Sequence, residues 1–471
     1  MSYTTVIGLE IHAELLTKSK VFCACENSFG GEANTRVCPV CAGMPGALPV
    51  LNKAAVMLAV RAGLCLGCKI NNYSSFDRKN YFYPDLPKAY QITQQDNPIC
   101  SDGIVTIGDK NIRINRIHIE EDAGKLIHSD NGVTLVDFNR CGIPLIEIVT
   151  EPDFNCAKQV CDFVEEVCLR LKYAGVCNAK LEEGSLRVDV NISLMPKDAK
   201  IFGTRAEIKN LNSLKSISAA IAYEIKRQSE ILDAKGKVIQ QTRRFDEKSG
   251  KTSSLRQKEG YEDYRYFHES DLLPIHLSDD DINEIKNDLP ELPQERLTRY
   301  INDYALSPND ATLIIKNKEF SDFYDKTVML YPNYKGVSAM MLGELNRNIN
   351  NDKGDISNLK FNPKMLAELI KMQNDKKITR SGAKMIFAIM YKTGKNPTDI
   401  AAENNLFLKD NSDEILEIAK QVLAENPDNV KNYHAGKTQL FGFFMGQIIR
   451  KTGKGVNPET VGNILNELLN N

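Results

Sequence analysis

Two stretches of the sequence place carboxylates among aliphatic residues, at positions 116–125 and 139–153. Glu147 is the clearest case, because Leu-Ile precede it and Ile-Val follow it. An ionised carboxylate in such surroundings costs several kcal/mol unless it is paired with a cation or bound to a metal ion. On these segments alone, a buried salt bridge to Arg116 or Arg140 and a metal site built from acids are both open.

Strand periodicity indicates which of these carboxylates would share a site. Side chains two residues apart lie on the same face of a strand, so Ile117, Ile119 and Glu121 are expected on one face and Glu120 on the other. Glu121 and Glu147 are therefore the predicted inward-pointing acids.

The first predicted strand, at positions 6–14, adds an imidazole to this set. One face would be apolar, and the other would carry Glu10, His12 and Glu14. Such a face is commonly just solvated, but with Glu121 and Glu147 it makes an oxygen-rich site for a divalent ion. Mg²⁺ is the natural occupant of such a site when phosphates are present.

Four cysteines form two close pairs separated by 12 residues, Cys23 with Cys25 and Cys38 with Cys41. Four thiolates at this spacing suit a tetrahedral structural Zn²⁺, although the one-residue gap of the first pair is short. Free thiols in a loop are the alternative. A further pair, at positions 65 and 68, follows a helical run and is interpreted as packing at a helix end.

Positions 76–95 interleave cations with aromatic residues and contain prolines. This composition is typical of an irregular loop that could present Lys79, Tyr81 and Lys88 to a phosphate or a nucleobase. An aromatic-packed surface loop fits the same spacing.

Length and composition limit what can position these groups. A chain of 471 residues suggests two to four domains, and no apolar run is long enough for a membrane span. The first residues lack the basic region of a signal peptide, so a cytoplasmic protein with reduced cysteines is expected. The net charge of -2 neither requires nor excludes a nucleic-acid partner.

The elements around the predicted site alternate strands with an amphipathic helix at positions 154–175. The strand that follows, at 186–194, would place Arg187, Asp189 and Asn191 on one face, and the next would present Glu207 and Lys209 likewise. Solvated strand faces give the same pattern. After Pro293 the periodicity becomes helical.

Many ordered motifs of this sequence resemble the GatB/GatE family, whose members serve the glutamyl-tRNA(Gln)/aspartyl-tRNA(Asn) amidotransferase. The resemblance extends over nearly the whole chain. It rests on positions 6–12, 76–85, 118–125, 144–149, 151–153, 182–187, 189–193, 209–213, 242–247 and 263–267.

This resemblance implies an α+β fold in three parts. A cradle domain with a mixed sheet would span residues 1–292 and carry the kinase and transamidation site. An all-α helical domain would span residues 293–408, and a small helical tail related to the YqeY proteins would span residues 409–471.

The implied activity is ATP-dependent amidation of misacylated Glu-tRNA(Gln), Asp-tRNA(Asn) or both. Ammonia would come from a GatA-type glutaminase subunit, and a small GatC-type subunit would complete a heterotrimer. The implied cofactors are ATP, Mg²⁺ and Zn²⁺.

The family's site residues carry over by position. The implied metal ligands are His12, Glu121 and Glu147. Residues implied in catalysis are Glu10, Lys79, Arg187, Asp189 and Lys209. Residues implied in ATP binding are Lys79, Tyr81, Arg187, Asn191, Glu207 and Lys209.

Positions 431–471 carry five cations against two carboxylates. This excess of positive charge predicts contacts with the phosphate backbone of tRNA through Lys437, Arg450, Lys451 and Lys454. A solvated helix face has a similar composition. The alternative for the whole chain is a zinc-stabilised tRNA-binding scaffold in which the acid cluster is structural.

Overall fold

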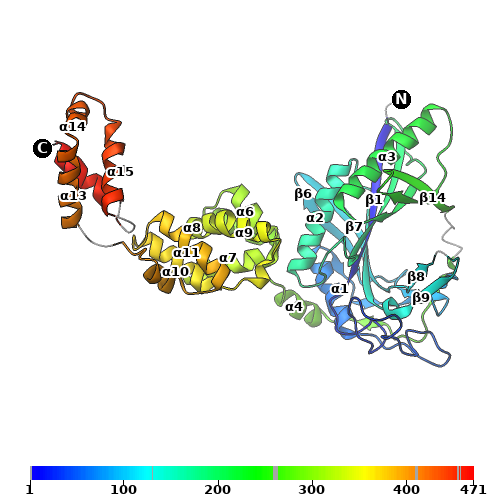
Figure 1. Cartoon of the computed structure of the whole chain (residues 1–471). Coiled ribbons are helices and arrows are strands. Elements are labelled where there is room, and N and C mark those ends of the chain that lie inside the picture. The colour runs from blue at the N-terminus through cyan, green and yellow to red at the C-terminus, as the bar shows by residue number, and fades with distance from the viewer. Residues whose placement is uncertain are drawn as a thin grey trace. The chain divides into compact units, whose positions relative to one another are not determined.

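The computed structural model describes residues 3–129, 131–257, 264–408, 412–452, 456 and 458–470. The chain divides into two compact units, Met1–Pro293 and Gln294–Asn471. Each unit is considered by itself (Figure 1).

The first unit is built on a mixed sheet. Among the described residues, nine strands form it in the order β14-β13-β12-β11-β1-β10-β7-β6-β2. Neighbours are antiparallel except for β12 and β13, which are parallel. In sheet order the strands are β14 (Lys251–Gln257), β13 (Gln241–Asp246), β12 (Ala206–Leu211), β11 (Leu186–Pro196), β1 (Tyr3–Glu14), β10 (Pro144–Thr150), β7 (Lys110–Glu121), β6 (Cys100–Ile107) and β2 (Lys69–Ile70).

Strand alternation separates the two faces of this sheet. In β1, the side chains of Ile7, Leu9, Ile11 and Ala13 are fully buried in one hydrophobic core. Three helices contribute apolar residues to the same core: α1 (Lys53–Cys65), α2 (Ala157–Tyr173) and α3 (Leu214–Asp233). The opposite face of the sheet is therefore left for polar side chains.

Short elements complete the first unit. They are β3 (Tyr73–Ser74) with β16 (Ile275–His276), β4 (Asp77–Asn80) with β5 (Tyr90–Thr93) and β15 (Phe267–His268), β8 (Lys125–His128) with β9 (Thr134–Asp137), the 3₁₀ turn η1 (Phe138–Arg140), and helix α4 (Asp279–Asn287).

The second unit is helical in its described part. Its first helices are α5 (Pro293–Asn302), α6 (Pro308–Ile315), α7 (Lys318–Leu330), α8 (Tyr334–Met340), the π-helical turn η3 (Met341–Leu345), α9 (Asn346–Asp352), the 3₁₀ turn η4 (Ile356–Asn358), α10 (Pro363–Asn374), α11 (Arg380–Thr393) and α12 (Pro397–Glu403). The last are α13 (Ser412–Glu425), α14 (Pro427–His434), α15 (Leu440–Thr452) and α16 (Pro458–Asn470).

Two separate hydrophobic cores organise these helices. One core runs from Tyr300 to Leu406 and the other from Ile415 to Leu469. None of the helices in the described ranges is long and apolar enough to cross a membrane. The predicted α+β class, with a mixed sheet followed by helices, is confirmed.

Candidate active site

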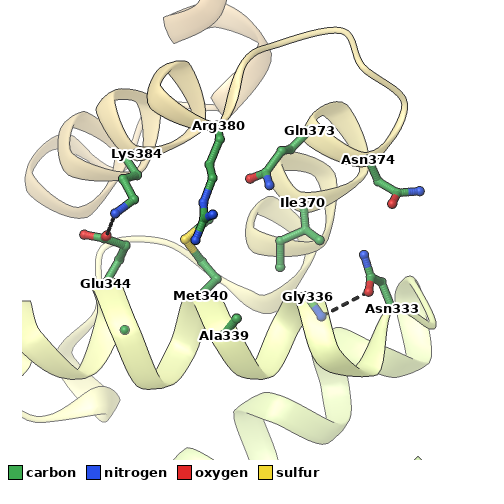
Figure 2. A pocket seen from close by; sticks show the side chains of 11 residues that line it. Asn333, Gly336, Ala339, Met340, Glu344, Ile370, Gln373, Asn374, Arg380 and Lys384 are labelled. Carbon is green, nitrogen blue, oxygen red and sulfur yellow. Dashed lines mark hydrogen bonds and ion pairs between the residues drawn. The ribbon is translucent and has the colours of Figure 1, made fainter. Parts of the chain in front are cut away.

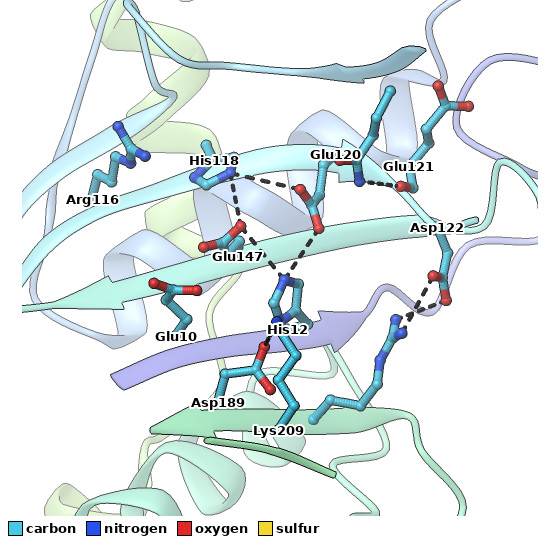
Figure 3. Close-up of polar contacts among 12 residues, drawn as sticks. Glu10, His12, Arg116, His118, Glu120, Glu121, Asp122, Glu147, Asp189 and Lys209 are labelled. Carbon is cyan, nitrogen blue, oxygen red and sulfur yellow. Dashed lines mark hydrogen bonds and ion pairs between the residues drawn. The ribbon is translucent and has the colours of Figure 1, made fainter. Parts of the chain in front are cut away.

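Four ionisable side chains meet on the polar face of the sheet, where β1, β10 and β7 are neighbours. The strand register places His12 opposite Glu147, and Glu147 opposite His118. His12 Nε2 lies 3.5 Å from Glu147 Oε2 and 3.4 Å from Glu120 Oε1. His118 Nε2 lies 3.3 Å from the same oxygen of Glu147. Figure 3 shows these side chains converging.

Glu121 lies outside this cluster, which corrects the expectation that it joins His12 and Glu147. Its Oε1 accepts hydrogen bonds from Lys88 Nζ at 2.6 Å and from the Ile92 backbone N–H at 3.0 Å. Figure 3 shows it pointing away from His12. The cluster forms on the polar face of the sheet. Consecutive residues of β7 point to opposite faces, so Glu120 lies in the cluster and Glu121 does not.

His118 is the residue that sequence reasoning missed. It stands two positions before Glu120, so the two share a face of β7. Its side chain is buried, and its Nδ1 has no hydrogen-bond partner among the described residues. The sequence feature that could have identified His118 is its two-residue spacing from Glu120, which places an imidazole and a carboxylate on the polar side of β7.

Burial and neighbouring charges shift the pKa values of this cluster in opposite directions. Burial alone would raise the pKa of Glu147, but the imidazoles of His118 and His12 hold it well below its usual range. Burial would lower the pKa of His12, but Glu147 and Glu120 raise it to about 9. Burial, with the charge of Glu147, raises the pKa values of Glu120 and Glu10. A bound cation would relieve this crowding of carboxylates.

The chemistry of the donors fits a divalent ion. The nitrogen of His12 and one oxygen each of Glu120 and Glu147 all lie within 4.8 Å of one another. One imidazole and two carboxylates are ligands that Mg²⁺ and Mn²⁺ accept. Glu10, Asp189 and Glu207 form a second such group of acids.

Cations flank the cluster along β11 and β12. The Lys209 ammonium is hydrogen-bonded to Asp189 and lies 3.1 Å from Glu207 Oε1. Arg187 Nη2 donates to Asp122 Oδ2 at 2.7 Å. These contacts place positive charge beside the carboxylates. They do not supply one cation for each carboxylate.

Lys79 also faces the carboxylates. Burial would lower its pKa, but Tyr266 and the carboxylates Glu120 and Glu147 raise it above its usual value. Its ammonium lies 4.9 Å from the centre of the Tyr264 ring. Lys79 therefore remains a cation at the edge of the site.

A cavity of about 410 Å³ brings most of the predicted residues together. Its lining includes His12, Glu120, Lys79, Tyr81, Arg187, Asp189 and Lys209. Glu10 and Asn191 line an adjacent cavity of about 490 Å³, where Asn191 Nδ2 donates to Glu10 Oε1 at 3.0 Å. The polar face thus continues from one cavity into the next along β1.

The second unit has a different kind of cavity. It measures about 350 Å³ and lies among residues of α8, η3, α10 and α11 (Figure 2). Lys384 pairs there with Glu344 at 2.9 Å. Its lining has no histidine or cysteine and a single carboxylate, so it lacks the groups of the first site.

The four predicted cysteines come together in the loop between β1 and α1. Their sulfurs lie within 4.8 Å of one another, with Cys41 Sγ 3.8 Å from Cys38 Sγ and 3.9 Å from Cys25 Sγ. Tetrahedral Zn²⁺ with Zn–S bonds of about 2.3 Å has sulfurs about 3.8 Å apart, so the group fits zinc. A hydrogen bond from Cys23 is the main cause that lowers the pKa of Cys41 to about 4.

The predicted tRNA-contacting cations of the tail differ in their surroundings. Arg450 is exposed, and Lys437 is exposed with a contact to Asn432 at 3.3 Å. Lys451 pairs with Glu425 at 2.6 Å. Lys454 lies outside the described residues.

Known proteins match both units of this chain. The family model described as the GatB/GatE catalytic domain matches residues 5–283. The model described as the GatB domain matches residues 322–469. The chain belongs to the GatB family of amidotransferase subunits.

GatB relatives align with the full length of this chain. Each of three is named as a subunit of the aspartyl/glutamyl-tRNA(Asn/Gln) amidotransferase. The Caldicellulosiruptor saccharolyticus protein is 50% identical, covering 100% of this chain and 99% of the relative. The proteins of Thermoanaerobacter pseudethanolicus and Clostridium novyi are 48% and 47% identical, covering 100% of both chains in each pair. The resemblance seen in the GatB motifs is confirmed.

Proposed function

We propose that this chain is the subunit of a tRNA-dependent amidotransferase that activates a misacylated amino acid with ATP. The substrate is Glu on tRNA(Gln), Asp on tRNA(Asn), or both, as the names of its relatives suggest. The observation that carries the proposal is the cluster of His12, Glu120 and Glu147 beside a cavity lined by cations.

The reaction explains why such a site is needed. Ammonia does not displace oxide from a carboxylate, because that oxygen is a very poor leaving group. Phosphorylation by ATP joins the carboxylate oxygen to the γ-phosphorus and releases ADP. Ammonia then forms the C–N bond, the C–O bond breaks and phosphate leaves. Because the attacking carboxylate is already ionised at neutral pH, the first step depends on positioning and charge.

The residues of the site divide this work. His12, Glu120 and Glu147 hold a divalent ion, which supplies positive charge for the phosphate oxygens when it is bound. Lys79 and Arg187 add cations that orient the polyphosphate and offset charge during transfer.

The remaining residues of the polar face support these groups and the nucleotide. Asp189 and Glu207 hold the Lys209 ammonium at the site, and Asn191 orients Glu10. Tyr81, which lines the cavity that His12 and Glu120 also line, adds an aromatic surface for ATP.

Zinc has a structural role in this proposal. Cys23, Cys25, Cys38 and Cys41 bind Zn²⁺ with four thiolates, which leaves no open coordination position for substrate. Held by these four cysteines, a zinc ion would tie together a loop that lies mostly outside regular secondary structure.

Other subunits complete the enzyme. The names of the relatives imply that each works within a larger assembly. We assign ammonia production to a glutaminase subunit of the GatA type, with a small subunit of the GatC type beside it. The tail binds the tRNA backbone through Lys437, Arg450, Lys451 and Lys454, of which Lys437, Arg450 and Lys451 are exposed. A cytoplasmic location stays a prediction.

The decisive experiment uses the purified heteromeric complex with ATP, Mg²⁺ and Glu-tRNA(Gln). Glu147→Gln removes one negative ligand from the cluster and should lower amidation by on the order of a hundredfold or more. The affinity for tRNA should stay near the wild-type value, because Glu147 lies in the sheet and the proposed tRNA-binding cations lie in the tail. Unchanged amidation would instead favour a zinc-stabilised tRNA-binding scaffold.

A further inference from the structure

Lys20 is a fully buried lysine at the start of the cysteine-rich loop. Its side chain has no exposed surface. Its ammonium donates to the backbone oxygens of Arg36 at 2.8 Å and Phe138 at 3.5 Å, and to Cys41 Sγ at 3.5 Å. These three acceptors match the three N–H groups of an ammonium.

The partners of Lys20 leave its charge unexplained. Backbone oxygens satisfy hydrogen bonds but carry no net charge. Among the described residues, the hydrogen-bond partners of the Lys20 ammonium are two backbone oxygens and one sulfur, and none is a carboxylate. Burying a lysine without an anionic partner is strongly unfavourable. The negative charge that compensates the ammonium must therefore come from the cysteine sulfurs.

The cysteine group supplies that negative charge. Zn²⁺ with four thiolates carries a net charge of -2, and Lys20 contacts the sulfur of Cys41, the one buried cysteine of the four. The Cys38 backbone N–H also donates to Cys41 Sγ, at 3.2 Å. Cys41 thus receives two hydrogen bonds of the kind that stabilise a metal-bound thiolate.

Lys20 also joins the segments that surround the cysteines. Its backbone N–H donates to the Cys25 oxygen at 2.9 Å, while its ammonium reaches Arg36 and the 3₁₀ turn η1. The same residue therefore touches both cysteine pairs and the turn that leads into β10.

We propose that Lys20 is the charge-compensating partner of a four-thiolate zinc centre and sets its affinity through Cys41. This inference rests on the zinc site of the proposed function. It adds a residue that binds no metal itself but positions a ligand and offsets its charge. Losing such a partner typically weakens metal affinity 10- to 100-fold.

The test compares zinc retention in the full-length chain. Lys20→Met keeps most of the length and the apolar stem but removes the ammonium group and its charge. It should release zinc to a colorimetric chelator on the order of tenfold faster than the wild type. Lys18→Met is the matched control, because Lys18 is exposed in the same segment and its loss should leave zinc release unchanged. Equal release rates for Lys20→Met and the wild type would overturn the inference.

A second measurement separates charge compensation from simple packing. Lys20→Met is also made in a chain whose four cysteines are serine, which cannot form the thiolate centre. In the zinc-loaded chain the substitution should lower Tm, whereas in the serine background it should leave Tm unchanged or raise it, because the buried charge has lost its partner. An equal loss of Tm in both backgrounds would mean a packing role only. Absence of zinc from the wild-type chain would overturn the zinc site itself, and this inference with it.

Discussion

At the scale of single residues, the site depends on protons and metal competing for the same atoms. His12 Nε2 faces two carboxylates, and together they raise its pKa to about 9 against the opposing effect of burial. An imidazole binds a metal ion only in its neutral form. At neutral pH the ion must therefore displace a proton from His12.

The affinity for a divalent ion is accordingly expected to rise with pH. Below the pKa of His12 one proton is released for each ion bound, so affinity should increase about tenfold per pH unit and level off near pH 9. Titration of the full-length chain with Mn²⁺ between pH 6.5 and 9.5, followed by electron paramagnetic resonance, measures this. His12→Gln should bind more weakly with a flatter profile, and a flat wild-type profile would contradict the assignment of His12 as a ligand.

At the scale of elements, the alternation of β7 decides which acid serves the site. His118 and Glu120 lie on the face that carries His12 and Glu147, whereas the Glu121 carboxylate contacts Lys88. Neighbouring residues of one strand thus have different roles.

This difference can be tested with two isosteric substitutions. Glu120→Gln should weaken Mn²⁺ binding and lower amidation by on the order of a hundredfold, because it removes a charged ligand. Glu121→Gln should keep metal binding but reduce stability by about 1–3 kcal/mol, because it breaks a buried contact with Lys88. Urea unfolding and metal titration of both variants give the comparison. The reverse pattern would restore Glu121 as the ligand.

Much of this arrangement follows from periodicity in the sequence. The polar faces of β1 and β11, the helix α2 and the change to helices after Pro293 were all predictable, because alternation and helical spacing are local. The choice of Glu120 over Glu121 was not, since both positions are buried and the sequence does not say which face of the sheet the helices cover. Lys20 was missed because its partners Arg36, Cys41 and Phe138 meet it only after folding.

At the scale of the whole molecule, chemistry and tRNA binding are assigned to different parts of the chain. The last described helices have a hydrophobic core of their own, from Ile415 to Leu469. A segment with its own core can be removed without opening the core of the sheet.

Truncation after residue 408 should therefore weaken tRNA binding more than ATP hydrolysis. Loss of the exposed cations of the tail is expected to raise the Kd for tRNA about tenfold or more at physiological salt. Hydrolysis of ATP by the truncated complex should remain close to the wild-type rate. Filter binding and a phosphate-release assay measure the two quantities, and a larger effect on hydrolysis would count against the role of the tail.

The position of β1 in the sheet also has a consequence for how the chain is made. β1 precedes the other described strands of the sheet along the chain, and its neighbours β10 and β11 begin only at Pro144 and Leu186. At a synthesis rate of about 5–20 residues per second, β1 waits on the order of 10–40 s for both partners. During translation, the segment that carries Glu10 and His12 is thus synthesised well before the two strands that pair with it, so its apolar face is covered late.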